Sequence, residues 1–153
     1  MDKTLFDVIR SQKLAAAPEE IIRQKLVRLL LNKGYPKSLI LIEQKISKLP
    51  HIHKQFGSLP DRRIDILVYC KEMAFQNEDI FPLLLIECKA VPLTRKVFRQ
   101  AAGYNYYIKA PFFALANSSE CIIGWHPKEA SFLQYFTGLP DYEELLKLYK
   151  NSQ

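Results

Sequence analysis

The segment over residues 83–89 constrains the fold most strongly, because an aliphatic run leads directly into two charged residues. The four aliphatic residues predict a strand that is buried on both faces. Glu87 and Lys89 follow, and along a strand they point to one face while Cys88 points to the other. Because an isolated charge inside a buried strand is very unfavourable, we place both at the end of the strand, beside a cleft.

A second carboxylate has a matching context, because Asp65 interrupts the apolar strand predicted over residues 62–70. If the two strands are neighbours, Asp65 and Glu87 converge and their charges repel each other. A divalent cation would relieve this repulsion, and oxygen ligands suit Mg²⁺ or Mn²⁺. Lys89 would then stand beside a water of the ion's hydration shell. The plainer alternative is that Glu87 and Lys89 form ion pairs on a solvated sheet edge.

The rest of the pattern predicts one α/β domain that spans residues 1–153. Helices are predicted over residues 15–35, 94–109 and 140–151, and strands over 38–46, 62–70, 82–90, 112–118 and 121–125. The polar residues 71–79 should connect the second and third strands. The first three strands are expected to be antiparallel, and the step from the third strand through a helix predicts a parallel crossover. We therefore expect a mixed central sheet of about five strands flanked by helices.

The first predicted helix carries the clearest end signals. Pro18 suits the first helical turn, and Glu19 and Glu20 lie where the helix dipole favours acidic side chains. Gly34 is the expected C-terminal stop. In the second helix, Gly103 is a mild defect.

Composition adds information about partners and compartment. The chain has 22 Lys and Arg against 16 Asp and Glu, so its net charge of +6 favours a polyanionic partner. Three widely spaced cysteines without a CxxC pair fit free thiols in a reducing, cytoplasmic setting. The sequence contains neither a signal-peptide pattern nor the run of ~18 apolar residues that a membrane span needs.

Five segments occur in a characteristic order: PEEIIRQKLVRLLLNKGY, LILIEQKI, RIDILV, LLLIECKA and RQAAGYNYY. This ordered set resembles the PD-(D/E)xK nuclease superfamily, and most closely the N-terminal nuclease domain of type I restriction enzyme R subunits. The resemblance covers residues 18–125. Ile64 stands where the superfamily's name has proline, and the GxxxxGK[ST] loop of a motor region is absent.

The resemblance implies a restriction-endonuclease-like fold and metal-dependent hydrolysis of DNA. By that resemblance, Asp65, Glu87 and the backbone carbonyl of Cys88 would hold Mg²⁺, for which Mn²⁺ could substitute. Lys89 would orient or activate the attacking water and offset charge on the phosphate. The metal would act as a Lewis acid and lower the pKa of its bound water.

The same resemblance implies further members of the site. Glu20 would reach the pocket as a supporting or second-metal carboxylate, although it also complements the helix dipole. Gln100 would position the metal-site groups or the phosphate, and Tyr104 would line the same face. The alternatives are a surface glutamine and a tyrosine packed in the core. Glu43 corresponds to the family's early strand acid.

Candidate DNA contacts surround these residues. Basic residues precede Asp65 and cluster on the predicted second helix. If they contact DNA phosphates, the affinity for DNA should fall as the salt concentration rises. The expected DNA-binding residues are Arg63, Arg95, Lys96, Arg99 and Tyr104, with Arg62 and Lys109 nearby. For any single one of them, a solvated charged face is the competing interpretation.

The function that these patterns favour is a cytoplasmic Mg²⁺-dependent DNA endonuclease of a restriction-modification system. Its expected partners are DNA and either other restriction-modification subunits or a second copy of the chain, with no membrane. Two alternatives remain open. One is a DNA-binding or assembly module that kept the fold without catalysis, and the other is a nuclease for DNA repair or junction resolution.

Overall fold

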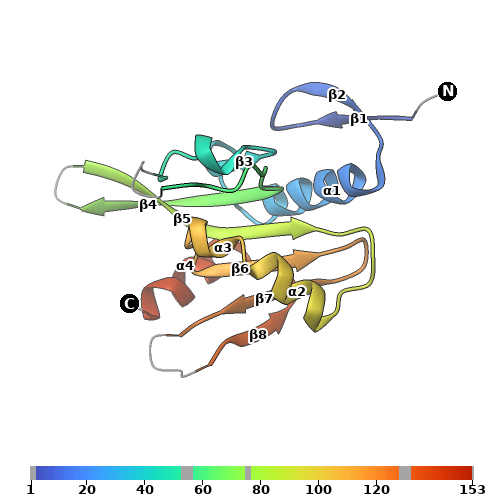
Figure 1. Cartoon of the computed structure of the whole chain (residues 1–153). Coiled ribbons are helices and arrows are strands. Elements are labelled where there is room, and N and C mark those ends of the chain that lie inside the picture. The colour runs from blue at the N-terminus through green and yellow to red at the C-terminus, as the bar shows by residue number, and fades with distance from the viewer. Residues whose placement is uncertain (1–2, 53–56, 75–76, 128–131, 153) are drawn as a thin grey trace.

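A six-stranded mixed sheet forms the centre of the computed structural model, which describes residues 3–52, 57–74, 77–127 and 132–152 (Figure 1). Its strands lie side by side in the order β3-β4-β5-β6-β7-β8. Their bounds are β3 Ile40–Ile42, β4 Ile66–Ala74, β5 Asn77–Cys88, β6 Phe112–Ala116, β7 Cys121–Trp125 and β8 Gln134–Thr137. Only β5 and β6 pair in parallel, and the other neighbours are antiparallel. The mixed sheet, the antiparallel start and the parallel crossover are confirmed.

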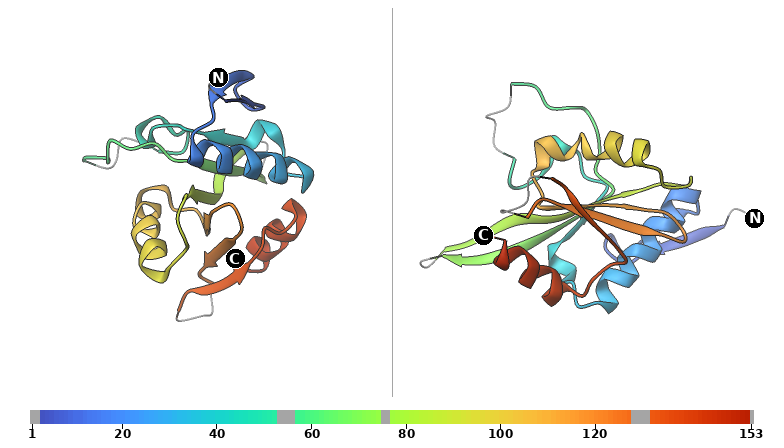
Figure 2. Two further views of the ribbon diagram at one scale, coloured as in Figure 1. Left: turned by 90° about the vertical axis from the view of Figure 1, so that its right-hand side faces the viewer. Right: turned by 90° about the horizontal axis from the view of Figure 1, so that it is seen from below.

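Helices cover both faces of this sheet. The helices are α1 Pro18–Asn32, α2 Arg95–Ala102, α3 Asn105–Ile108 and α4 Tyr142–Asn151. Seen from below, α1 and α4 lie on one face, and α2 and α3 lie on the other (Figure 2). No helix in the described ranges has both the length and the apolar character to cross a bilayer.

A short antiparallel hairpin precedes α1 and forms a separate two-stranded sheet from β1 Thr4–Asp7 and β2 Gln12–Ala15. Neither this hairpin nor β8 was predicted. The strand β8 brings the central sheet to six strands, where about five were expected. Each of these three strands is only four residues long. Their alternation of apolar and polar residues is too brief to give a clear period.

Two predicted boundaries were wrong. The polar residues 71–79 were expected to be a connection, but β4 runs to Ala74 and β5 begins at Asn77, while residues 75–76 lie outside the described part. Backbone pairing such as Lys71 with Ile80 holds these arms of the hairpin together, and that pairing needs no apolar pattern. The helix expected over residues 94–109 divides at Gly103 into α2 and α3.

The end signals of α1 are confirmed. The helix begins at Pro18, carries Glu19 and Glu20 in its first turn, and is followed by Gly34 with a φ of +83°. Glycine adopts this left-handed conformation without the steric penalty that a Cβ atom would impose.

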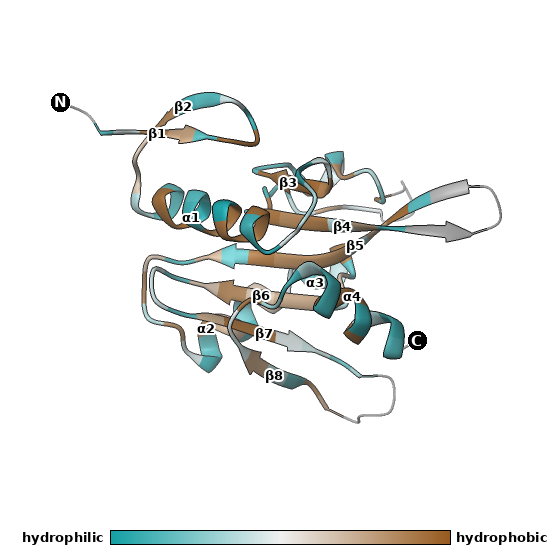
Figure 3. Cartoon of the chain, turned by 180° about the vertical axis from the view of Figure 1, so that it is seen from behind, coloured by the Kyte–Doolittle hydropathy of each residue, from teal (hydrophilic) through white to brown (hydrophobic). Residues whose placement is uncertain are grey.

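The alternation along β5 divides the core into two layers. Leu84, Ile86 and Cys88 pack in the layer that also contains buried residues of α1 and α4. Leu85 packs in the opposite layer with residues of α2 and α3. The centre of β5 is hydrophobic, and a hydrophilic band lies near its C-terminal end (Figure 3). This end, where Glu87 and Cys88 lie, adjoins the start of β4.

Phe98 connects α2 to the far edge of the sheet. Its buried ring lies edge-on to Phe113, with centroids 5.1 Å apart, and edge-on to Tyr135, with centroids 5.3 Å apart. A Cβ atom added to Gly124 of β7 would meet the Cζ atom of Phe98 at 2.8 Å. The absence of a side chain at Gly124 therefore allows α2 to sit close to the sheet.

We predict that Gly124→Ala lowers the free energy of unfolding by about 1–3 kcal/mol, because the Phe98 ring cannot move without disturbing its aromatic neighbours. Urea denaturation followed by the fluorescence of Trp125, the single tryptophan, measures the change. Gly57→Ala is the matched control, since a Cβ atom there meets nothing within 4 Å. Equal stabilities for the two variants would contradict this account of the packing.

Candidate active site

Asp65 and Glu87 lie opposite one another where β4 begins and β5 ends. Ile66 pairs with Ile86 in antiparallel register, so the next opposing residues are Asp65 and Glu87. Directly opposed residues of an antiparallel pair have Cβ atoms roughly 4.5–5.5 Å apart. The Asp65 carboxylate also accepts a hydrogen bond from the Cys88 backbone N–H to Oδ2 at 2.8 Å. The structure thus brings together the two carboxylates that the sequence singled out.

Glu87 is a buried acid whose two oxygens differ in their contacts. The residue is 2% exposed, and its Oε2 atom accepts a hydrogen bond from Arg62 Nη2 at 2.8 Å. Its Oε1 atom is buried without a hydrogen-bond partner among the described residues. Burial, followed by the charge of Asp65, raises the pKa of Glu87 to about 8, although Arg62 acts in the opposite direction. The surroundings of Glu87 therefore favour its protonated form more than water does.

Arg23 of α1 contacts the Asp65 carboxylate and two further carboxylates of the site. Its guanidinium is 2.8 Å from Asp65 Oδ1, 2.6 Å from Glu43 Oε1, and also contacts Glu20. The residue is buried, and burial alone would lower its pKa. The three acids outweigh that effect and raise the pKa of Arg23. One cation thus contacts three acids that come from different parts of the chain.

The backbone at Glu43 has an unusual conformation. Glu43 follows β3 with a φ of 53°, which side chains other than glycine, asparagine and aspartate adopt rarely. Its N–H donates to the Asp65 carbonyl at 3.2 Å. This left-handed residue costs of order 1 kcal/mol, and such strain clusters at functional sites. The conformation accompanies the contact of Glu43 with Arg23.

The N-terminal hairpin adds a second arginine to this network. Arg10 Nη2 lies 3.6 Å from Glu20 Oε1, and that oxygen also accepts a hydrogen bond from Gln24 at 3.0 Å. Asp7 is fully buried beneath Arg10 and accepts from the backbone N–H groups of Ile9 and Arg10. Burial opposes ionisation of Asp7, but these bonds outweigh it and lower its pKa. The hairpin is therefore linked to α1 through charged groups.

Tyr104 supports the arginine that contacts Glu87. The Cζ atom of Arg62 lies 3.6 Å from the centroid of the Tyr104 ring, a cation–π contact. Tyr104 occupies the turn between α2 and α3, so the break at Gly103 brings its ring to Arg62. The predicted role of Tyr104 in DNA binding stays a prediction.

Lys89 and Gln100 occupy different surroundings. Lys89 follows β5, is half-buried, and its N–H donates to the carbonyl of Ala116 at 2.8 Å. Its positive charge acts to lower the pKa of Glu87, and its ammonium forms no ion pair within the described residues. Gln100 is exposed on α2, and the structure does not bring it into hydrogen-bond contact with the described site. Its role stays a prediction.

The expected DNA-contact residues lie on the surface. Arg63 is exposed, with its Nη1 atom 3.9 Å from Glu43 Oε2. Arg95, Lys96 and Arg99 are exposed on α2. The four basic residues are therefore accessible to a polyanion.

Several members of the network were missed by sequence reasoning, above all Arg23. The helical stripe that buries Val27 and Leu30 passes through position 23, four residues before Val27. A charged residue inside an apolar stripe was the available signal. No comparable pattern marks Asp7 or Arg10.

No group of three or more histidine, cysteine, aspartate or glutamate side chains in the described ranges is arranged to hold a metal ion. Glu20, Glu43 and Asp65 face Arg23 instead. The described structure also brings together Asp65, Glu87 and the Cys88 backbone, the three ligands that the resemblance implied.

Comparison with known proteins gives one match. The family model described as type I restriction enzyme R protein N terminus matches residues 18–140. This span includes the elements from α1 to β8 and leaves the N-terminal hairpin and α4 outside. No curated protein and no solved structure matches the chain.

The raised pKa of Glu87 predicts a pH-dependent stability. Between pH 4.5 and about 8 the folded protein holds a proton that the unfolded chain releases, so the free energy of unfolding falls as pH rises. Glu87→Gln removes this dependence, because glutamine does not bind or release a proton in this range. Relative to the variant, the wild type should lose on the order of 3 kcal/mol between about pH 5 and about pH 9.

Urea denaturation in EDTA at several pH values measures this difference. Glu143→Gln on α4 provides a control for the loss of an exposed carboxylate. Parallel pH profiles for the wild type and Glu87→Gln would show that Glu87 ionises normally.

Arg23→Leu should lower the free energy of unfolding by about 3–5 kcal/mol, because it leaves three acids without their shared cation. Denaturant unfolding measures the loss. Arg28→Leu, on an exposed position of the same helix, should change stability little. Similar losses in both variants would contradict the central role of Arg23.

Proposed function

This chain belongs to the family of type I restriction enzyme R protein N-termini, and we propose that it is a Mg²⁺-dependent DNA endonuclease. The observation that carries the proposal is the opposition of Asp65 and Glu87 at the junction of β4 and β5. Lys89 follows two residues later on the same strand path, and its charge acts on Glu87. Two acids and an amine at one point are suited to hydrolysis of a phosphodiester bond.

The groups at this junction fit a magnesium ion. Glu87 Oε1 is a buried oxygen without a hydrogen-bond partner in the described part, and Asp65 lies opposite. The Cys88 N–H points to Asp65, and a strand residue's carbonyl leaves on the same side as its N–H. Asp65, Glu87 and the Cys88 carbonyl would thus offer oxygen atoms only. Mg²⁺ prefers such ligands, takes few of them from protein, and keeps several waters.

When bound, Mg²⁺ would supply Lewis-acid activation of the scissile phosphate. Glu87 would give up its proton as it becomes a ligand, so binding should release a proton below about pH 8. The Lys89 ammonium would orient the attacking water and offset charge on the phosphate. Mn²⁺ could replace Mg²⁺ with the same ligands.

The surrounding cations would hold the DNA. Arg63, Arg95, Lys96 and Arg99 are exposed, and each phosphate contact adds affinity that falls with salt. Arg62 has a 30% exposed side chain beside Glu87 and could turn to a phosphate as Glu87 engages the metal. In the cell, other restriction-modification subunits or a second copy of this chain would be the protein partners.

A non-catalytic DNA-binding module is the second candidate, and one observation favours it. Arg23 contacts Glu20, Glu43 and Asp65, and Arg10 and Arg63 add a second arginine at Glu20 and at Glu43, so three guanidinium groups face these three acids without a metal ion. Such a module would bind DNA through the same surface cations without taking up metal. Metal binding therefore separates the two functions.

We predict that the wild type nicks or linearises plasmid DNA in Mg²⁺ or Mn²⁺ and is inactive in EDTA. Asp65→Asn, Glu87→Gln and Lys89→Met should each reduce the rate by at least about 100-fold, because each removes a charge that acts at the reacting phosphate. Lys147→Met, an exposed lysine on α4, should leave the rate unchanged.

Calorimetric titration with Mg²⁺ completes this test. Asp65→Asn should lose metal binding while its DNA affinity in EDTA stays within about twofold of the wild type. DNA binding by the wild type without metal uptake or cleavage would reject the nuclease in favour of the non-catalytic module. A strong preference for branched over linear DNA would instead favour junction resolution.

A further inference from the structure

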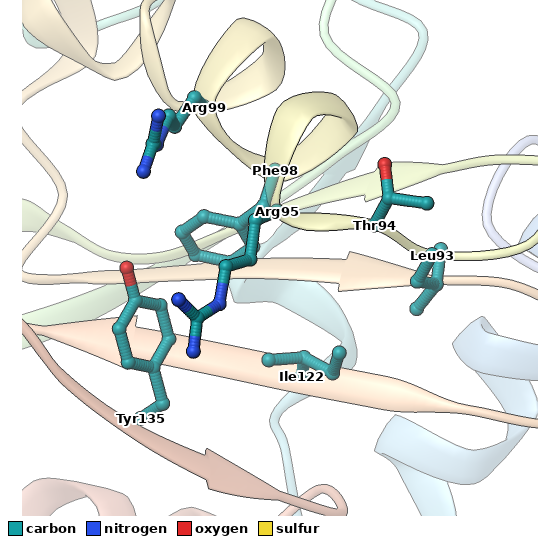
Figure 4. Close-up of a pocket in the computed structure, with 7 residues that line it drawn as sticks. All are labelled: Leu93, Thr94, Arg95, Phe98, Arg99, Ile122 and Tyr135. Atoms are coloured by element: carbon teal, nitrogen blue, oxygen red, sulfur yellow. The ribbon is translucent and has the colours of Figure 1, made fainter.

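A cavity of about 490 Å³ lies between α2 and the strands β7 and β8, apart from the carboxylates (Figure 4). Leu93 and Ile122 give it an apolar lining, and Arg95 and Arg99 reach it from α2. Its volume is within the range of ligand pockets, roughly 300–1,000 Å³. The mixture of an apolar lining and two arginines without an ion pair in the described ranges restricts the kind of ligand that would fit.

An aromatic side chain lines this cavity and packs against a buried ring. Tyr135 of β8 is 58% exposed, yet its ring lies edge-on to Phe98 at a centroid distance of 5.3 Å and an angle of 70°. Phe98 is held in turn by Phe113 and by its close approach to Gly124. A rigid, solvent-facing aromatic ring can stack on a planar ligand at little cost in conformational entropy.

The two arginines at the cavity carry like charges on one helix. Arg95 and Arg99 are four residues apart on α2, a spacing at which like charges destabilise a helix. Neither forms an ion pair with a carboxylate in the described ranges. In Figure 4 the Arg95 side chain extends from α2 toward the strand that carries Tyr135. An anion held between these groups would relieve the repulsion.

From these features we infer that the cavity binds one unpaired nucleotide of single-stranded DNA. The base would stack on Tyr135 against the apolar lining, and the flanking phosphates would contact Arg95 and Arg99. A base within a duplex is stacked on both sides and cannot enter. This inference rests on the proposed function, since it specifies which form of DNA the nuclease domain holds.

The position of the cavity suits that role. Arg95 and Arg99 lie on the helix that leads through Gly103 to Tyr104, whose ring supports Arg62 beside Glu87. The helix α2 therefore lines the cavity, and the turn that follows it carries the ring that contacts Arg62. A strand anchored by one base would have its backbone directed along this basic surface.

The test measures binding of a fluorescent oligothymidylate by anisotropy in EDTA, so that cleavage plays no part. Tyr135→Ala should weaken this binding by about tenfold or more, whereas Tyr135→Phe keeps the ring and should remain within about twofold of the wild type. Affinity for the matching duplex should change by less than about twofold in both variants. Arg95→Ala should weaken binding and reduce its salt dependence.

Two variants provide matched controls. Tyr106→Ala removes an exposed tyrosine on α3, and Lys147→Ala removes an exposed charge on α4. Neither should selectively weaken binding of the single strand. Circular dichroism of every variant verifies that a loss of affinity does not come from unfolding.

Several results would overturn the inference. One is an equal effect of Tyr135→Ala on single-stranded and duplex DNA, or no effect on either. A second is tight, Tyr135-dependent binding of thymidine monophosphate, which would assign the cavity to free nucleotides. A third is a dimer in sedimentation experiments that Tyr135→Ala dissociates while oligothymidylate affinity is unchanged. Because the assay contains no metal, a failure of plasmid cleavage leaves its result interpretable, and a failure here leaves the cleavage test intact.

Discussion

The contact of Arg23 with three acids is the interaction on which the rest of the site depends. Glu20 comes from a helix, Glu43 from a loop after an edge strand, and Asp65 from the start of a central strand. Bringing these three carboxylates together without a cation would be unfavourable, because their charges repel one another away from water. A guanidinium suits this task because its planar fork donates several hydrogen bonds in fixed directions. The network therefore fixes α1 relative to the sheet as well as orienting Asp65, whose other oxygen faces the Cys88 N–H.

Strand register is the second constraint. Ile66 pairs with Ile86, and a slip of one residue would turn Glu87 to the layer that contains α1 and α4 and bury Cys88 in its place. Such a slip would move the Glu87 carboxylate among the apolar side chains of that layer, away from Arg62, which is unfavourable. The hydrophobic core thus determines which carboxylates meet, and Glu87 remains buried with its raised pKa as a result.

Sequence patterns predicted the central elements well because those elements are long or strongly punctuated. The aliphatic run before Glu87 predicted a buried strand, and Pro18 with Gly34 marked the ends of α1. The convergence of Asp65 and Glu87 followed from treating their strands as neighbours. The partners of these acids were not predictable in the same way: Arg62 and Arg23 reach them through tertiary contacts, and the contact between Arg62 and Tyr104 depends on the turn at Gly103. Gln100, which was assigned by analogy alone, lies exposed on α2.

The N-terminal hairpin has a practical consequence for anyone who trims this protein to its recognisable portion. The family match starts at residue 18, after the segment that carries Asp7 and Arg10. A fragment begun there would keep Glu20 but lose the arginine that approaches its Oε1 atom, together with the buried acid that anchors that arginine. Boundaries drawn from similarity would consequently cut through an electrostatic unit, and work on this domain should retain the preceding residues.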